Sequence, residues 1–347
     1  MHNVIGTLIS TLKLTKRTTI DDVARLANVS VATVSRVLSG ADPRRFSAET
    51  AEKVRDAARS VNYYPSELGR SLRTSNARAA ALLVPDTTNE FCADVASSLE
   101  GALQHDKLSM ILCNTAEDPV RQDTYLNQLD SRGISAIVIQ GVVMSPKLQE
   151  MSARGTQMVF VSRRPPEPIQ GDFVGIDNQA AGQDVASYFL KKGYRNCAAI
   201  HGSLTYAASR ERLQGFCAKL KSEGVVIPKK LMIQSMLTPD AGYEHAKKLL
   251  EMKSPPRAIF CGNDSIAYGV YRAALELGLS VPKDLAIFGF DDNRINRWLA
   301  PWLSTVHVPV ADFGAAVAQI LKEQAEQPNR IPRTILLPHT LAIRESA

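Results

Sequence analysis

The stretch TTIDDVARLANVSVATVSRVLSG, residues 18–40, predicts two short helices joined by a tight turn. Thr19 can cap the first helix, because Asp22 stands three residues later as the acidic member of a capping-box-like pair. The sequence Asn28-Val29-Ser30 interrupts the apolar periodicity, and Ser30 is a good N-cap for a second helix. Two such helices form a helix-turn-helix, whose second helix is shaped to lie in the major groove of DNA.

The second helix has an apolar face and a small, polar and basic face. Its outer residues could contact DNA, and they are Val31, Ala32, Thr33, Ser35 and Arg36. Small apolar side chains can touch a thymine methyl group, whereas arginine can bind guanine or phosphate. Val31 and Ala32 could also be ordinary helix surface. Thr19 and Ser30 are primarily caps, although helix N-termini also bind phosphates.

A third helix and a concentration of positive charge extend this motif. Ser47 can cap the third helix, so residues 18–62 are expected to fold as a compact three-helix DNA-binding unit. Residues 1–78 hold 13 of the 41 Lys/Arg and 7 of the 35 Asp/Glu. Residues 79–347 hold the other 28 basic and 28 acidic side chains, so their charges sum to zero. The whole net charge of +6 therefore lies beside the helix-turn-helix, as expected of a module that binds a polyanion.

The segment 63–78 is basic and has no apolar face wide enough to fold alone. It could be a linker. It could also be a hinge helix that orders on DNA, with Leu72 as an apolar wedge in the minor groove. The residues that would surround this wedge at the DNA are Ser66, Gly69, Arg70 and Arg73.

The N-terminal segment and the cysteines bear on the compartment. Residues 1–17 are expected to be a disordered extension, and their basic residues follow the apolar run rather than precede it, unlike a secretory signal. No apolar run reaches the roughly 18 residues of a membrane span. The five scattered cysteines form no C-x-x-C pair and indicate reduced thiols in a cytoplasmic protein. The six histidines do not cluster with cysteines, so no metal or cofactor is expected.

From residue 79 onward, short apolar runs alternate with amphipathic stretches. The expected strands are 79–85, 108–114, 136–141, 157–162, 197–202, 258–262 and 285–290, and the expected helices are 91–104, 119–132, 180–192, 209–223, 240–252 and 265–277. This alternation predicts parallel sheets covered by helices. About twelve strands are too many for one small sheet, so two α/β subdomains with a ligand-binding cleft between them are expected.

The chain resembles the LacI/GalR family of bacterial transcriptional repressors from about residue 18 onward. The matching motifs are TIDDVARLANVSVATVSRVL, NYYPSELGRSLRT, GIDNQAAG, SRERLQGF, GNDSIAYGV and FGFDD. The resemblance implies an all-α helix-turn-helix headpiece and a periplasmic-binding-protein-like α/β sensor with two parallel-sheet subdomains. The effector-binding and dimerisation domain would cover 79–347, as about 79–177 with 309–330 and 178–306 with 331–347.

The resemblance also implies a function. The chain would be a sequence-specific repressor of carbohydrate or related catabolic genes, bound as a homodimer to a pseudo-palindromic operator and switched by a small-molecule effector. Val31-Ala32 resembles the galactose-repressor branch. Gly69 replaces an alanine common in the family and costs about 1 kcal/mol of helix propensity. No heptad pattern follows the last strand pattern, so a dimer is expected rather than a tetramer.

The resemblance places effector-binding side chains in both subdomains. They are Asn89, Phe91, Ser162 and Arg163 in the first, and Tyr206, Arg212, Asn263 and Asp291 in the second. Asp291 can accept hydroxyl groups and Arg212 offers a fork of donors, but Asp264 or Asp292 could be the pocket acid instead, and Arg212 could belong to a structural ion pair.

The chemistry of the effector is less specific in this sequence. Ser162 stands where the family often has Asp or Asn, which weakens the inference of any particular sugar. Arg163, Arg164 and Arg210 add positive charge nearby, so an acidic effector such as a sugar acid or a sugar phosphate is a candidate beside a sugar.

Two other classes of protein fit less well. A periplasmic sugar-binding protein would share the α/β body, but it needs a signal peptide and has no DNA-binding head. An α/β enzyme would be expected to show a catalytic motif, and the chain has no G-x-x-x-x-G-K-[ST], G-x-S-x-G or H-E-x-x-H. His201 follows a predicted strand and could approach the cleft, but a lone histidine does not indicate catalysis.

Overall fold

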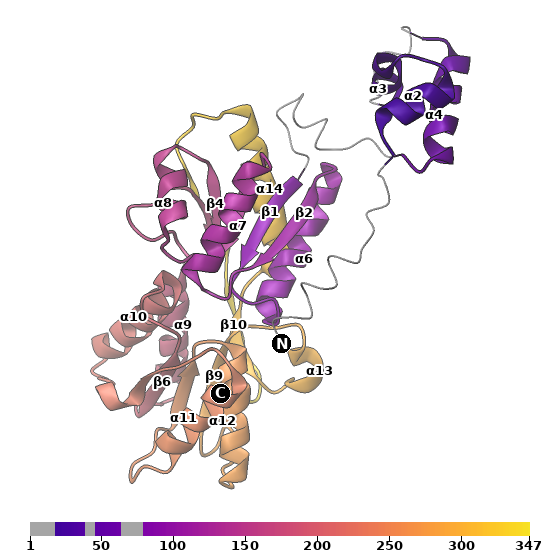
Figure 1. The fold of residues 1–347 in the computed structure, drawn as a ribbon. Coiled ribbons are helices and arrows are strands. Elements are labelled where there is room, and N and C mark those ends of the chain that lie inside the picture. The colour runs from indigo at the N-terminus through magenta and orange to yellow at the C-terminus, as the bar shows by residue number, and fades with distance from the viewer. Residues whose placement is uncertain (1–17, 39–45, 64–78) are drawn as a thin grey trace, which may run out of the picture. The chain divides into compact units, whose positions relative to one another are not determined.

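The structure is a computed structural model that describes residues 18–38, 46–63 and 79–347 (Figure 1). The chain forms two compact units, Met1–Ala77 and Arg78–Ala347. The N-terminal extension and the predicted hinge from residue 64 onward, including Leu72, lie outside the described residues, so their predicted roles are not tested.

The N-terminal unit contains the three predicted helices, α2 (Ile20–Ala27), α3 (Val31–Leu38) and α4 (Ala48–Ser60). The predicted caps are confirmed. Thr19 and Asp22 form a reciprocal capping box, in which the amide of Thr19 donates to Oδ2 of Asp22 over 2.9 Å. Ser30 and Ser47 each accept a hydrogen bond of 3.1 Å from the backbone amide three residues later. Each helix therefore begins where its side-chain cap predicts.

The core of this headpiece is small. Val23, Val34 and Val54, one from each helix, are fully buried at its centre. Alanines make up most of the remaining core, so little apolar area is removed from water. A unit of this size is expected to be only marginally stable by itself.

The second unit contains two six-stranded sheets. The first sheet has the order β11-β5-β4-β3-β1-β2, with β1 (Ala79–Val84), β2 (Ser109–Asn114), β3 (Ala136–Gln140), β4 (Met158–Val161), β5 (Asp172–Gly175) and β11 (Thr334–Leu336). The second has the order β12-β10-β9-β8-β6-β7, with β6 (Cys197–His201), β7 (Met232–Gln234), β8 (Ala258–Cys261), β9 (Ala286–Asp291), β10 (Ser304–His307) and β12 (Thr340–Ala342). The described strand pairs are parallel except β10 with β12, which is antiparallel.

Helices cover both sheets and divide the unit into two lobes. The first lobe has α6 (Glu90–His105), α7 (Pro119–Ser131), α8 (Pro146–Ala153) and α14 (Val310–Glu326). The second has α9 (Asn178–Lys191), α10 (Ala207–Ser222), α11 (Pro239–Leu250), α12 (Asp264–Glu276) and the short α13 (Asn296–Leu299). The central strands β4, β8 and β9 are buried throughout, because helices shield both faces of each sheet. None of the helices in the described part of the chain has the length and apolar character that a bilayer-spanning segment requires.

The chain crosses between the lobes after β5, after β10 and after β11. Late segments therefore complete the early lobe: α14, yellow in Figure 1, packs beside α6 of the first lobe. The predicted assignment of 331–347 to the second subdomain is wrong in part. Strand β11 pairs with β5, with Ile335 opposite Val174, and only β12 joins the second sheet. The physical reason is that β11 extends the open edge of the first sheet before the chain crosses back.

Candidate DNA-binding and effector-binding sites

Helix α3 presents a small, partly basic surface. Val34 and Val37 face the core, whereas Val31, Ala32 and Arg36 are exposed, as the sequence predicts. The half-buried Thr33 shares a hydrogen bond of 2.9 Å with the hydroxyl group of Ser30, and Ser35 is also half-buried. The exposed side of α3 thus combines two methyl-bearing side chains with one arginine, which suits thymine methyl groups and a guanine or phosphate.

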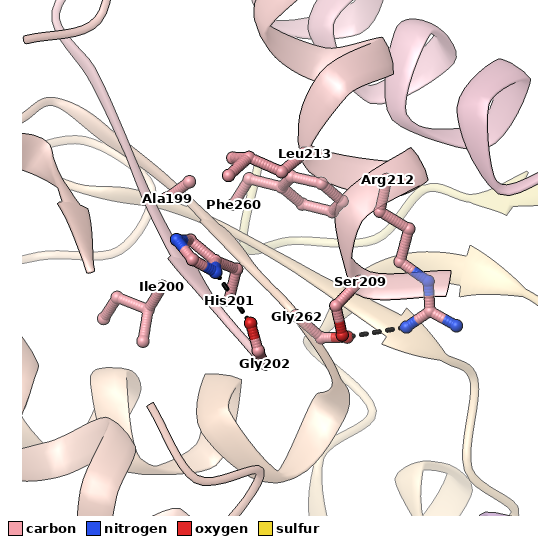
Figure 2. A pocket seen from close by; sticks show the side chains of 9 residues that line it. All are labelled: Ala199, Ile200, His201, Gly202, Ser209, Arg212, Leu213, Phe260 and Gly262. Atoms are coloured by element: carbon pink, nitrogen blue, oxygen red, sulfur yellow. Dashed lines mark hydrogen bonds between the residues drawn. The ribbon is translucent and has the colours of Figure 1, made fainter. Parts of the chain in front are cut away.

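Arg212 on α10 is half-buried, and three neighbouring groups hold its guanidinium, of which Figure 2 shows the Gly262 contact. Its Nε donates to Oδ1 of Asn178 and its Nη1 donates to the carbonyl of Gly262, both over 2.8 Å. Its guanidinium lies 3.5 Å from the centre of the Phe290 ring. Burial lowers the pKa of Arg212 to about 10, although the nearby charge of Asp291 opposes that shift. Arg212 is therefore a fixed donor with an unusually dry environment.

Two glycines fix the helix that carries Arg212. A Cβ atom on Gly182 of α9 would lie 2.1 Å from the carbonyl oxygen of Arg212, and one on Gly215 of α10 would lie 2.0 Å from the carbonyl oxygen of Gln179. The two helices therefore touch backbone to backbone, which only glycine permits at these positions. Since Asn178 begins α9, the same contact also places the acceptor of the Arg212 guanidinium.

Asp291 ends β9 with a buried carboxyl group, and only 7% of the residue is exposed. Within the described residues its carboxylate has no hydrogen bond and no ion pair. Burial raises the pKa of Asp291 to about 8; the charge of Arg212 opposes this shift and that of Asp264 adds to it. Its φ of 107° is a sparsely populated conformation for a residue other than glycine, and such strain clusters at functional sites. These properties suit an acceptor that a ligand completes.

The two alternative acids have structural partners instead. Asp264, at the start of α12, accepts hydrogen bonds from Oγ1 of Thr305, the amide of Asn293 and Nδ2 of Asn296, at 2.6, 2.9 and 2.8 Å. Asp292 binds Nη2 of Arg344 over 2.8 Å and Nδ1 of His307 over 3.0 Å. Of the three neighbouring acids, Asp291 is therefore the one that is open to a ligand.

The first lobe has two buried oxygen atoms that also lack partners. The residue missed by sequence reasoning is Gln140, which ends β3 and pairs in register with Val161, so it lies beside Ser162 at the carboxyl edge of the sheet. Oε1 of Gln140 and Oγ of Ser162 are buried without a hydrogen bond to any described group. Such atoms cost about 1–3 kcal/mol each. The sequence did offer one sign of Gln140, because it is the polar residue that ends the otherwise apolar strand 136–140.

Arg163 and Tyr206 join the lobes through a third residue that the sequence did not single out. The guanidinium of Arg163 lies 3.5 Å from the centre of the Tyr206 ring. Glu117, from the loop after β2, accepts a hydrogen bond from Nη2 of Arg163 and another from the hydroxyl group of Tyr206, both over 2.7 Å. Glu117 lies in a loop with no motif, which is why sequence analysis could not place it.

The other predicted effector residues have framework contacts in this structure. Asn89 caps α6 through a 3.2 Å bond from the amide of Cys92, and Phe91 packs edge-on against Phe313. Asn263 caps α12 through a 2.9 Å bond from the amide of Ile266 and donates to the carbonyl of Leu237. Their roles in effector binding stay predictions.

The sites of the two lobes share one electrostatic environment. Burial is the main cause of the pKa shifts of Arg212 and Cys92, and smaller contributions cross between the lobes: Arg163 lowers the pKa of Arg212, and Asp291 raises that of Cys92. A pocket in the second lobe is lined by Ala199, Ile200, His201, Gly202, Ser209, Arg212, Leu213, Phe260 and Gly262 (Figure 2). It includes Arg212 alone among the predicted effector residues. Nδ1 of His201 faces the carbonyl of Gly202, and burial lowers the pKa of this histidine.

The raised pKa of Asp291 predicts a pH-dependent stability. The folded chain holds this proton up to about pH 8, whereas an Asp in the unfolded chain has an ordinary pKa of 3.8, so the free energy of unfolding falls as pH rises between those values. The stability advantage of Asp291→Asn over the wild type should therefore grow by about 2 kcal/mol between pH 6 and pH 8. Urea unfolding of both proteins at the two pH values measures it, and an advantage that does not change would contradict the assignment.

Comparisons with known proteins identify both parts of the chain. Residues 19–66 match the family model described as "Bacterial regulatory proteins, lacI family", and residues 186–347 match "Periplasmic binding protein-like domain". The chain is 31% identical to the HTH-type transcriptional regulator DegA of Bacillus subtilis (strain 168), over 95% of this chain and 98% of DegA. It is 31% identical to the ribose operon repressor of Escherichia coli (strain K12), over 95% of this chain and 99% of the repressor. Among solved structures, the transcriptional regulator CelR–cellobiose complex matches with a TM-score of 0.73 and 25% identity, over 95% of this chain and all of the other.

Proposed function

Because the chain belongs to the lacI family of bacterial regulatory proteins, it is a DNA-binding transcriptional regulator and not an enzyme, and we propose that α3 reads its operator. We further propose that a neutral sugar, bound between Arg212, Asp291 and the first lobe, switches the affinity for this operator. The observation that carries the effector site is the buried, unpartnered carboxylate of Asp291 beside the fixed guanidinium of Arg212. Repression of carbohydrate or related catabolic genes follows from this effector class.

The DNA site combines α3 with the helix caps and the hinge. We infer that Val31 and Ala32 contact bases, that Arg36 binds a guanine or phosphate, and that Thr19, Ser30, Thr33 and Ser35 bind the backbone or base edges. The hinge contribution of Ser66, Gly69, Arg70, Leu72 and Arg73 rests on sequence. A homodimer presents two such surfaces to the half-sites of a pseudo-palindromic operator. This function places the protein in the cytoplasm, where the chromosome lies.

Replacing Arg36 by alanine should weaken operator binding by about 1–3 kcal/mol, which is roughly five- to 150-fold. The physical reason is that no other exposed side chain of α3 carries a positive charge. Fluorescence anisotropy with an operator selected from random DNA by the wild type, at fixed salt, measures the change. Arg55→Ala on α4 is the matched control, because Arg55 is exposed on a helix outside the reading surface. Equal losses in the two variants would contradict the role of Arg36.

The arrangement of charges favours a neutral effector over the acidic one considered from sequence. Arg163 is paired with Glu117 over 2.7 Å, and Arg164 lies 3.7 Å from Glu211. Two of the three basic side chains that suggested an acidic ligand are therefore paired with carboxylates, and the third, Arg210, donates to the backbone carbonyl of Leu204. The buried carboxyl group of Asp291, which has no hydrogen-bond partner among the described residues, suits the hydroxyl groups of a sugar, which both donate and accept. Two similar proteins, a ribose operon repressor and CelR in complex with cellobiose, are named for sugars.

The test is a titration of the operator complex with neutral sugars, including ribose and cellobiose, and in parallel with sugar acids and sugar phosphates. We expect at least one neutral sugar to change operator affinity at constant ionic strength. A response only to the acidic compounds would overturn the proposed effector class. The direction of the change assigns inducer or corepressor, because a ligand shifts DNA affinity only through its different affinities for the two states.

A further inference from the structure

Three side chains join the two lobes at the border of the proposed effector site, and we call Glu117, Arg163 and Tyr206 the interlobe latch. Glu117 and Arg163 belong to the first lobe, and Tyr206 immediately precedes α10 of the second. The carboxylate binds both partners over 2.7 Å while the guanidinium stacks on the ring at 3.5 Å. Every pair among the three residues is thus in contact.

The latch differs from an ordinary surface ion pair. The side chain of Arg163 is only 13% exposed, and partial burial strengthens both the charge-assisted hydrogen bonds and the cation–π contact. A second interlobe contact joins Arg294 to Asp94 and the amide of Ile295 to Glu90; its arginine side chain is 76% exposed, so solvent screens the ion pair. The lobes are therefore held more firmly at the latch than at this second contact.

The backbone on both sides of the latch is fixed. Ala116 and Glu117 are consecutive non-glycine residues in the left-handed region, with φ of 53° and 55°, directly before the Asp118 cap of α7. Strain of this kind persists where the surrounding structure requires it and marks functional positions. On the other side, Tyr206 precedes the helix whose Gly215 lies against the backbone of α9. Neither side can yield by itself, so a change in lobe spacing must break or reshape the latch.

We propose that the interlobe latch sets the lobe spacing of the effector-free protein and that operator affinity depends on whether this latch is closed. The proposal rests on the proposed function and adds the device that couples the site to DNA. Arg163 follows Ser162, and Tyr206 lies two turns before Arg212 along the chain, so a ligand that contacts Ser162 and Arg212 borders the latch.

The first experiment needs no effector. Operator affinity of the full-length chain is measured for Tyr206→Phe, Glu117→Gln and the double variant. Tyr206→Phe keeps the ring that stacks on Arg163 and removes only the hydroxyl group. We expect each single variant to shift the operator Kd about fivefold or more in the same direction. The double variant should shift it no further than one single variant, because both remove the same contact.

A matched control tests whether losing any tyrosine–carboxylate bond has this effect. The hydroxyl group of Tyr243 on α11 donates to Oε2 of Glu276 on α12 over 2.5 Å, entirely within the second lobe. Tyr243→Phe should leave the operator Kd unchanged. Equal shifts in Tyr206→Phe and Tyr243→Phe, or additive shifts in the double variant, would overturn the latch.

Hydrogen exchange separates failure of the latch from failure of the proposed function. In the effector-free and DNA-free protein, either single variant should speed amide exchange by about threefold or more in both 115–121 of the first lobe and 203–212 of the second. Faster exchange only in the lobe that carries the substitution overturns the latch. If exchange behaves as expected but the wild type selects no operator, then the latch stands and the regulatory function fails.

Discussion

Replacing Asp264 by alanine will lower the free energy of unfolding of residues 79–347 by about 3–5 kcal/mol. The carboxylate is completely buried and accepts three hydrogen bonds, which join the start of α12 to β10 and to the segment after β9. Alanine leaves three buried donors without an acceptor, and each such donor costs about 1–3 kcal/mol. Burial raises the pKa of Asp264 to about 6, so the measurement belongs at pH 7.5, where the group is ionised.

The matched control is Asp177→Ala, which removes an aspartate at the start of another helix, where it acts as the N-cap. Asp177 caps α9 through a 2.9 Å bond from the amide of Ala180, and loss of a cap typically costs about 1 kcal/mol. Urea unfolding of both variants compares the two losses. A loss in Asp264→Ala that is no greater than in Asp177→Ala would mean that the three hydrogen bonds do not act as a structural centre. Asp264 would then become a candidate pocket acid again.

Replacing Asp291 by asparagine will abolish most of the effector response while operator binding without effector is retained. Above about pH 8, where Asp291 is ionised, a carboxylate that accepts two sugar hydroxyl groups contributes about 1.5–3 kcal/mol per hydrogen bond, so the comparison belongs at that pH. Their loss corresponds to a decrease in sugar affinity of about 100-fold or more. Asparagine has the same shape and removes a buried carboxyl group whose pKa is raised to about 8, so the variant should be at least as stable as the wild type.

Calorimetric titration with the neutral sugar found in the operator assay measures this loss. Asp292→Asn is the control, because Asp292 is the next residue but is paired with Arg344 and His307. It should bind the sugar nearly as well as the wild type, apart from any loss of stability. Unchanged sugar affinity in Asp291→Asn would remove Asp291 from the site, whatever its electrostatics.

Local chemistry explains what the sequence predicted correctly. The caps at Thr19, Ser30 and Ser47 and the buried valines of the headpiece depend on neighbours within four residues, so their patterns are readable along the chain. The seven predicted strands are continuous apolar runs, and all of them are observed to within about two residues at each end. Burial on both faces by helices is what makes such runs recognisable.

Five of the strands in the described residues were not predicted as separate strands, namely β5, β7, β10, β11 and β12. Strands β7, β11 and β12 have only three residues each and lie at or near the sheet edges, where half of the side chains stay in solvent. Their sequences carry too few apolar residues to form a period. The crossing from β11 to β12 likewise depends on which sheet offers a free edge, a property of the folded lobes and not of the segment.

The candidate site was predictable where a motif carried it and not elsewhere. Arg212 and Asp291 lie in family motifs, so the sequence singles them out, and their effector-binding roles stay predictions. Gln140 is a candidate because its buried Oε1 has no hydrogen-bond partner, and Glu117 is one because it accepts a hydrogen bond from Tyr206 of the other lobe. Both properties exist only once the strands and lobes have assembled. The positive charge of Arg163 could be read from the sequence, but the sequence did not show that Glu117 would be the carboxylate that pairs with it.

Completion of the first lobe by β11 has a consequence for protein synthesis. The headpiece is finished by residue 63, but the first sheet lacks its edge strand until residue 336 has left the ribosome. At about 5–20 residues per second, the intervening chain of about 270 residues takes roughly 15–55 s to translate. For that interval each nascent chain carries a DNA-binding head without the finished sensor that governs it. Because its core is small, the headpiece is only marginally stable by itself during that interval.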